Sequence, residues 1–463
     1  MRLVSLESVS PEMKLGEAIY SPAGLLLLAQ GAPLTPDYVG KLRGYGLPAV
    51  YVDDGDTRDI EPPHAISPAL RGKVVKKLSK AFEALGQPGP EAVRDGKGSS
   101  KDAGPPPDPA GTGHLGPNYR PPENLAQELE AVVDGVDHLL GELDDRDVLI
   151  GLNSIKTHDD YTYQHSIDVA IVGSLLARRA GWNRRRMRDF AIGCILHDIG
   201  KVFVEPAILN KQGPLTPAEF ERVKAHPTLG YELIKVSLPR LGSLVPQVAY
   251  QHHERQDGSG YPRALKGNNK LGQGEGQGAA ASSGSGQRGA QRRREPGNPL
   301  LIHDFGSLCA VADIYDALTA ARPYRPGYSP DRVVDAISRM SGTHLNQEAV
   351  ALFLSVVSPY PVCAEVRVLD GKYAGWVGVV ASVPSHDLAR PVVRLLHDST
   401  GKRIAPVELD LAVDRDVRIE GSRGGGTPQE RRPGGLAAAR PAPLPDVVRQ
   451  TLRQMSGAGW ARV

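Results

Sequence analysis

The chain has 463 residues, a formal net charge of +2 and a 40% share of hydrophobic residues. This length predicts more than one domain, and the hydrophobic share is large enough to build real cores. The nearly balanced charge argues against a nucleic-acid coat protein and against a strongly electrostatic membrane binder.

Cysteine usage and hydropathy narrow the class of protein further. The three cysteines, Cys194, Cys309 and Cys363, form no CxxC pair, so neither a disulfide framework nor a cysteine-ligated zinc site is predicted. There is no run of 18 or more apolar residues, which argues against a membrane-spanning helix. The first residues also lack the apolar segment of a signal peptide. We therefore expect a cytoplasmic protein with buried, reduced cysteines.

Residues 1–55 read as a small α+β accessory module. Residues 18–29 predict two strands around a Pro-Ala-Gly turn. Thr35 precedes proline and aspartate, the pattern of a helix N-terminus, and residues 49–52 predict a further strand. No residue here stands out chemically, so an accessory structural role is favoured over a sensory or docking role.

The middle of the chain is predicted to be helical, with two interruptions. Residues 56–85 predict a connecting helix, and residues 86–122 are rich in Gly, Pro, Asp and Ser, which predicts a disordered linker. Residues 123–360 are helical in pattern. Within them, residues 266–299 are rich in Gly, Ser and Gln and predict a disordered insertion, because they contain too little apolar surface to fold alone.

The last part of the chain changes to strand chemistry. Residues 365–380 carry a β-hairpin signal around Asp-Gly, and residues 391–396 predict another strand. Residues 361–421 therefore predict a β-rich accessory domain of about five strands, a small barrel or sandwich. Residues 422–463 predict a mostly disordered tail. The fold class expected is multidomain, with an all-α bundle between a small α+β module and a small all-β module.

One histidine–aspartate pair lies in unusually apolar surroundings. The chain has five His-Asp dipeptides, but only His197-Asp198, in the stretch CILHDIGK, lies deep in a predicted apolar helix. Burying unpaired ionisable groups is costly, so these side chains should be paired, metal-bound or next to a cleft.

Other histidines and aspartates occupy comparable positions. His165 lies early in a predicted helix over 161–180, His226 ends a predicted helix that opens at Thr216, and Asp313 lies in an almost wholly apolar helix. His252 and His253 end a predicted helix over 245–253. Taken alone, each has a plain structural explanation. His165 would be a core histidine, and His226 a helix stop. His252 and His253 would be a surface pair, and Asp313 a capping or ion-pair carboxylate. Together they favour a metal cluster inside a helical bundle, with iron, manganese or zinc-like ions preferred by ligands that include no thiolate.

Five segments resemble the HD-GYP family of bacterial cyclic di-GMP phosphodiesterases, a branch of the HD metal-dependent phosphohydrolases. They are TYQHSIDVA, ILHDIGK, ILNKQGPLTPAEFERVKAHPTLGYEL, QHHERQDGSGYP and AVADIYDALTAARPYR, and they span roughly residues 150–340. The combination of the His-Asp-Ile-Gly-Lys motif with the His-His-Glu and Gly-Tyr-Pro motifs is highly specific. The flanking modules resemble accessory segments seen around such domains, with a weaker signal.

The resemblance implies a metal centre and a substrate site. The metal ligands it implies are His165, His197, Asp198, His226, His252, His253 and Asp313, with Asp198 bridging two metals. Tyr161 stands where family members with a third metal have glutamate, so two divalent ions are expected, with iron or manganese favoured. Lys201 would lie beside the scissile phosphate. The substrate contacts implied are Tyr261, Gly260 and Asp257 in the Gly-Tyr-Pro loop, and Arg322 and Arg325 at the ligand phosphates.

The expected activity is metal-dependent hydrolysis of cyclic di-GMP to pGpG, with continuation to GMP left open. The alternatives are a catalytically weak cyclic di-GMP sensor, and an HD phosphohydrolase acting on another cyclic dinucleotide or nucleotide. No nucleic-acid or membrane partner is expected, while a homodimer or a signalling partner protein is left open. Three departures from the family are the glutamine at Gln256 in place of tryptophan, the absence of an arginine within 305–308, and the insertion.

Overall fold

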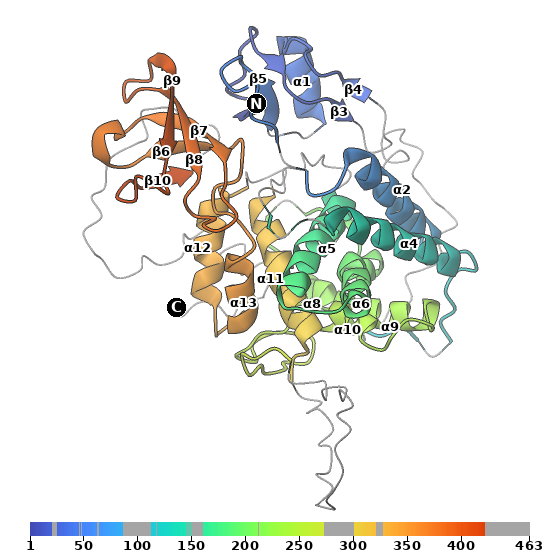
Figure 1. The fold of residues 1–463 in the computed structure, drawn as a ribbon. Helices are drawn as coiled ribbons and strands as arrows, with labels where there is room; N and C mark the ends of the chain where they lie inside the picture. Colours follow the sequence, from blue (N-terminus) through green and yellow to red (C-terminus); the bar gives the residue numbers. More distant parts are fainter. Residues whose placement is uncertain are drawn as a thin grey trace, which may run out of the picture.

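The computed structural model describes residues 1–20, 26–86, 113–149, 161–272, 301–320 and 327–421, with single-residue gaps at 46, 48, 63, 117, 145, 147 and 212. Figure 1 shows the helices other than α1 gathered in one body, with two strand-containing parts lying against one side of it. The helical character expected for the middle of the chain and the β regions expected at either side are therefore confirmed. None of the described helices has the length and apolarity needed to cross a membrane.

The helical body is formed by helices from residues 68–354. Its elements are α2 (Pro68–Ala84), α4 (Leu125–Leu143), α5 (Tyr161–Arg179), α6 (Arg184–Ile195), the 3₁₀ helix η1 (Ile199–Phe203), α7 (Pro206–Leu209), α8 (Pro217–Lys224), α9 (His226–Ser237), α10 (Val245–Gln251), α11 (Asp304–Thr319), α12 (Pro330–Met340) and α13 (Gln347–Leu354). Helix α5 lies near the centre and packs against both α6 and α11.

Local sequence signals account for several of these helix boundaries. Thr216 accepts a hydrogen bond from the backbone N–H of Glu219, whose side chain in turn accepts one from the Thr216 N–H, so a capping box starts α8 at the predicted position. Helix α4 buries residues at helical spacing along one face, among them Leu125, Leu129 and Val132, and packs this face against α2. These interactions hold in place the helices that carry the polar residues of the bundle.

The first strand-containing part follows the predicted pattern closely. Helix α1 (Pro36–Gly44) starts where expected, with the Thr35 hydroxyl accepting a hydrogen bond from the Tyr38 N–H. The predicted strands are β3 (Ile19–Tyr20), β4 (Leu26–Leu28) and β5 (Ala49–Asp53). The sequence did not indicate β1 (Arg2–Ser5) and β2 (Lys14–Leu15), which pair on either side of β5.

The second strand-containing part is a five-stranded antiparallel sheet in the order β10-β6-β7-β8-β9. Its strands are β6 (Glu365–Val368), β7 (Val377–Ser382), β8 (Val392–His397), β9 (Arg403–Asp410) and β10 (Ile419–Gly421). The hairpin predicted over 365–380 is the pairing of β6 with β7. Alternate residues of these strands point into a common apolar core.

The two strand-containing parts share this core, which local sequence patterns did not predict. Tyr51 of β5 and Ile60 are buried among the apolar residues of the five-stranded sheet. The backbone N–H of Leu3 donates to the carbonyl of Cys363 at 3.1 Å. Residues more than 300 positions apart in sequence therefore complete one another's packing. Figure 1 shows the N-terminal strands and helix α1 next to the sheet that contains β7 and β8.

Two helix boundaries in the segments that resemble the HD-GYP family differ from expectation. His197 and Asp198 were predicted inside a helix, but α6 ends at Ile195 and the pair lies in the turn before η1. His226 was predicted to end a helix, but α8 ends at Lys224 and His226 begins α9. In the first case the apolar run continues across the helix end, so hydrophobic periodicity alone could not locate it.

The two segments predicted to be disordered are ordered at their edges. Residues 113–116 and 118–122, from the end of the predicted linker, pack on the bundle: the Leu115 N–H donates to Glu232 at 2.6 Å. Residues 266–272, the start of the predicted insertion, also pack: the Leu271 N–H donates to Glu348 at 2.7 Å. The side chains of Leu115 and Leu271 also pack against the hydrophobic core of the bundle, which the polar composition around them does not indicate. The remaining parts of both segments, 87–112 and 273–299, and the tail 422–463 lie outside the described residues.

Candidate metal centre

The bundle brings together all seven side chains for which a metal-binding role was predicted. They fall into two groups. Within each group, the ligand-capable atoms all lie within 4.8 Å of one another. The groups are Asp198, His226, His252 and His253, and His165, His197 and Asp313. Helix α5 supplies His165, α11 supplies Asp313, the start of α9 supplies His226, and the turns after α6 and α10 supply the rest.

The Asp198 carboxylate lies between the two groups. Its Oδ2 is 3.6 Å from Nε2 of His165 and 3.4 Å from Nε2 of His197. Its Oδ1 is 3.3 Å from Nε2 of His226 and 3.7 Å from Nε2 of His252. One oxygen thus faces each group. This is the arrangement in which a single carboxylate can contact two cations at once.

Backbone carbonyls orient three of the imidazole rings. Nδ1 of His197 lies 2.7 Å from the carbonyl oxygen of Cys194, and Nδ1 of His226 lies 2.7 Å from that of Val223. Nδ1 of His252 lies 2.8 Å from the Ala249 carbonyl oxygen. A carbonyl oxygen only accepts hydrogen bonds, so each Nδ1 carries a proton and donates it. The Nε2 lone pair of each neutral ring is left facing the centre.

The arrangement of these nitrogens fits a bound cation. Nε2 of His226 and Nε2 of His252 lie 3.2 Å apart, which sets two lone pairs against each other when both rings are neutral. Burial lowers the pKa of His226 and lowers that of His252 to about 4, so neither ring readily takes a second proton. A cation between the rings removes the repulsion. Imidazole and carboxylate donors together suit divalent transition metals.

Two further atoms in the cluster point to the same conclusion. Nε2 of His197 and Oδ1 of Asp198 are buried and have no hydrogen-bond partner among the described residues. Leaving such atoms unsatisfied costs about 1–3 kcal/mol each. Burial alone would raise the pKa of Asp198, but the charge of Lys201 opposes this effect, and that pKa lies well below its usual range. The carboxylate is therefore charged and ready to bind a metal.

Lys201 lies at the open side of this cluster. Its ammonium donates to Oδ2 of Asp198, and its side chain keeps 31% of its surface exposed. The group therefore reaches from the carboxylate toward solvent. A cation in this position would meet an anionic group that approaches the centre from outside.

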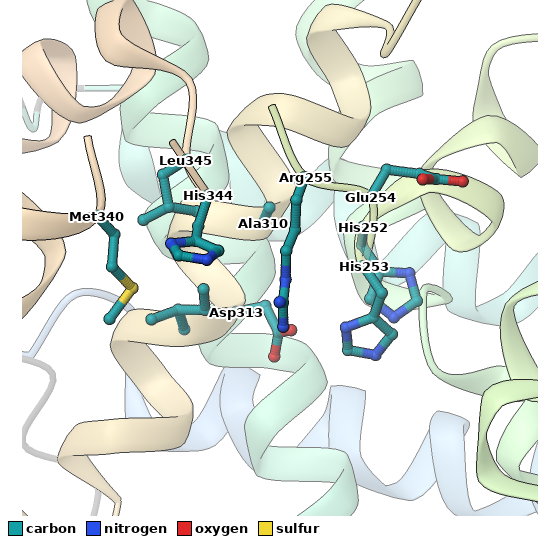
Figure 2. Close-up of a pocket in the computed structure, with 10 residues that line it drawn as sticks. His252, His253, Glu254, Arg255, Ala310, Asp313, Met340, His344 and Leu345 are labelled. Atoms are coloured by element: carbon teal, nitrogen blue, oxygen red, sulfur yellow. The ribbon is translucent and has the colours of Figure 1, made fainter. Parts of the chain in front are cut away.

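A pocket opens beside the cluster, and Figure 2 shows residues that line it. Its walls include His252, His253 and Asp313 from the cluster, together with Arg255 and His344. The Arg255 side chain lies between His344 and His253 in this view. Burial, and then the Arg255 charge, lower the pKa of His344 to about 4, so this ring is neutral. The pocket thus presents one permanent cation next to the cluster.

The loop that was predicted to contact substrate lies at the rim of this site. The Tyr261 ring stacks on His253, with centroids 4.7 Å apart and an angle of 29° between the planes. Gly260 lies so close to the backbone of Arg255 that an added Cβ would be 2.5 Å from the Arg255 backbone nitrogen. Asp257 does not join the cluster: its Oδ1 accepts from the Ser259 N–H at 2.8 Å, and its Oδ2 lies 3.7 Å from His344.

The structure also places residues that the sequence did not single out. Glu254 accepts hydrogen bonds from the N–H groups of Arg263 and Leu265, both at 2.8 Å, and so fastens the Gly-Tyr-Pro loop to the residue after His253. Asp316 lies 2.7 Å from Nδ1 of His165. Its position three residues after Asp313, on the same face of a helix, was the available signal. Arg322 and Arg325 lie outside the described residues, and the Tyr161 side chain is not described.

Comparison with known families identifies this part of the chain. A protein-family model described as an HD domain matches residues 152–269. This segment is therefore similar to HD domains. Six of the seven clustered residues lie within it, and Asp313 follows it on α11. The resemblance drawn from the sequence motifs is thereby confirmed at the level of the HD superfamily.

Curated relatives carry phosphodiesterase names. The chain is 32% identical over 277 residues to a cyclic di-GMP phosphodiesterase of Pseudomonas aeruginosa. The aligned region is 59% of this chain and 58% of that protein. It is 31% identical over 211 residues to a cyclic di-GMP phosphodiesterase of Thermotoga maritima, covering 45% and 49%. It is 31% identical over 183 residues to a 3'3'-cGAMP-specific phosphodiesterase of Vibrio cholerae, covering 40% and 35%. The chain spans about half the length of these first two relatives.

Proposed function

We propose that this protein is a metal-dependent phosphodiesterase that hydrolyses cyclic di-GMP to pGpG, with GMP as a further product where a second cleavage follows. The observation that carries the proposal is the Asp198 carboxylate, which has one oxygen toward each of two imidazole groups and Lys201 beside it. The names of the relatives support cyclic di-GMP as the substrate.

The proposed cofactor is a pair of divalent cations, iron or manganese. His226, His252 and His253 would hold one ion, His165, His197 and Asp313 would hold the other, and Asp198 would contact both. Bound there, the ions would supply Lewis acidity at a phosphodiester and activation of water. Three imidazoles that donate Nδ1–H to backbone carbonyls, and a charged carboxylate, support this assignment.

The chain's own cations would handle the negative charge of the substrate. Lys201 would offset the charge that develops on the phosphoryl oxygens during hydrolysis. Arg255, in the pocket wall, would orient a phosphate or a guanine edge through paired N–H donors. The pocket holds only about 30 Å³, well below the roughly 300–1,000 Å³ of a typical small-molecule site. A cyclic dinucleotide would therefore lie across its mouth, against Tyr261.

The flanking parts are proposed to be accessory to this chemistry. Residues 123–360 would form the catalytic domain, and residues 1–55 and 361–421 would serve as accessory modules, for which a signalling partner or a second copy of the chain remains open. The shared core of Tyr51 with the five-stranded sheet supports treating the two modules as one unit.

A turnover panel tests the proposal against its alternatives. The purified full chain, loaded anaerobically with Fe²⁺ or Mn²⁺, is incubated separately with cyclic di-GMP, 3'3'-cGAMP and cyclic di-AMP, and products are separated by chromatography. We expect pGpG from cyclic di-GMP at the highest rate. Metal-loaded protein that binds cyclic di-GMP but leaves it intact for hours would establish a sensor instead. Preferential cleavage of 3'3'-cGAMP would reassign the substrate, a result that the relatives from Vibrio cholerae make worth testing.

Lys201→Gln is expected to lower kcat about 100-fold while leaving the metal content unchanged, because it removes one charge-stabilising donor beside the reacting phosphate. Metal analysis and initial rates on the same preparation measure both quantities. Lys211→Gln is the matched control: Lys211 is 32% exposed, close to the 31% of Lys201, and pairs with Glu219 away from the cluster. Loss of metal together with activity in Lys201→Gln would show that this lysine maintains the site rather than contacting the substrate.

A further inference from the structure

We infer that Asp316 is a positioning residue that holds His165 in the tautomer and ring orientation needed to bind a metal. Oδ2 of Asp316 lies 2.7 Å from Nδ1 of His165. Both side chains are buried, with 2% of the Asp316 side chain and 6% of the His165 side chain exposed. In a neutral imidazole, a carboxylate that accepts from Nδ1 leaves the lone pair on Nε2. The inference rests on the metal centre of the proposed function and extends it to a residue outside the predicted ligand set.

The position of His165 explains why a side chain is needed for this task. His197, His226 and His252 lie at or beyond the ends of helices, and each donates its Nδ1 proton to a carbonyl oxygen three residues earlier. His165 instead lies within α5, and its Nδ1 faces another helix. In a regular helix the carbonyls are already used by the N–H groups four residues later. The acceptor for this ring therefore comes from the side chain of Asp316 on α11.

Helix α11 contacts the same imidazole at both nitrogens. Oδ1 of Asp313 lies 3.2 Å from Nε2 of His165, while Asp316, one turn later, lies at Nδ1. The two carboxylates share a face of the helix because they are three residues apart. The ring is thus held between them, and its inward nitrogen is directed at the cluster. Such outer partners of metal-binding histidines tune metal affinity by 10–100-fold in other proteins.

Metal affinity provides the test, measured without any nucleotide. The full chain, stripped of metal, is titrated with Mn²⁺ in competition with a chelating indicator. We expect Asp316→Asn to bind Mn²⁺ about 10–100-fold more weakly than the wild type. Saturating Mn²⁺ should restore most of kcat, because Asp316 acts through His165 and does not contact the substrate. The absorption spectrum of the Co²⁺-loaded protein should also change, since the field at His165 is altered.

Asp168→Asn is the matched control. Asp168 is fully buried on α5, three residues after His165, and its Oδ1 accepts a hydrogen bond from Arg71 at 2.8 Å. Asparagine retains an acceptor for Arg71, and we expect Mn²⁺ affinity to stay at the wild-type value. The thermal midpoint of each metal-free variant is recorded, so that a general loss of stability is separated from a loss of metal affinity.

Several outcomes would overturn the inference. Wild-type Mn²⁺ affinity in Asp316→Asn would do so, as would an equal loss of affinity in Asp168→Asn, or a kcat that stays low at saturating Mn²⁺. A measurement on the wild type decides the matter if Asp316→Asn fails to fold. In ¹⁵N spectra of histidine-labelled, Zn²⁺-loaded protein, we expect a protonated Nδ1 in His165, and a metal-bound Nδ1 there would reject the inference. A wild-type protein that binds Mn²⁺ but hydrolyses no cyclic dinucleotide would defeat the proposed function and leave this inference standing.

Discussion

Asp198→Ala is expected to abolish both metal binding and hydrolysis. This carboxylate is the single group with atoms within 3.7 Å of His165, His197, His226 and His252 across the described cluster. Its removal would take a negatively charged ligand from each of the two groups at once. Replacing a mere outer partner of a metal ligand costs about 10–100-fold, so we expect the rate of cyclic di-GMP hydrolysis to fall by more than about 100-fold. Metal content by elemental analysis and product formation are measured on the same sample.

A second buried aspartate provides the control for this experiment. Asp304 begins α11 and pairs with Arg186 at 2.8 Å, outside the cluster. Asp304→Ala should lower the thermal midpoint, because it leaves a partly buried guanidinium without this partner, but should retain metal and turnover. An Asp198→Ala protein that kept two equivalents of metal would rule out the bridging role of the carboxylate.

The second large effect is expected from Gly200→Ala. Gly200 lies in η1, where an added Cβ would be 2.0 Å from the carbonyl oxygen of His226 and 2.6 Å from the N of Gly230. Both are backbone atoms of α9, so no side chain can move aside. We expect the free energy of unfolding to fall by about 3 kcal/mol or more, at the upper end of overpacking costs. Metal affinity should fall as well, because α9 carries His226 next to Asp198.

Urea unfolding of the helical body measures the change in stability. Gly141→Ala is the contrasting variant, since Gly141 lies on the exposed side of the last turn of α4 with no other atom within 4 Å of an added Cβ. It should stabilise the protein by about 0.5–1 kcal/mol, because alanine is the better helix former. If Gly200→Ala unfolded at the wild-type urea concentration, the close contact between η1 and α9 would be refuted.

Much of the candidate site could be predicted because its residues carry unusual local contexts. A His-Asp pair in an apolar run, adjacent histidines at the end of a predicted helix and an aspartate in an apolar helix are each visible within a few residues, and the costs of burial make their coincidence informative. The structure brings these side chains together, and their role as metal ligands remains a prediction. Thr35 and Thr216 likewise marked helix starts because capping is a local interaction.

What could not be predicted depends on partners far away in sequence or on backbone atoms. The hydrogen bond between Asp316 and His165 joins residues 151 positions apart and exists because α11 packs on α5. The carbonyls that orient His197, His226 and His252 belong to the main chain, so no side-chain pattern reports them. The same reason explains why the shared core of the two strand-containing parts was missed.

That shared core has a consequence for the order in which the protein is made. Tyr51 leaves the ribosome early, but the sheet that buries it begins at Glu365. At about 5–20 residues per second, translation of the intervening chain takes roughly 15–60 s. During that interval the Tyr51 ring has no cover from its eventual neighbours, while the first part's own apolar residues, such as Val4 and Val50, are already available to pack. Closing the contact across the whole helical body makes it one of the last steps of folding, since long loops cost entropy before they gain contacts.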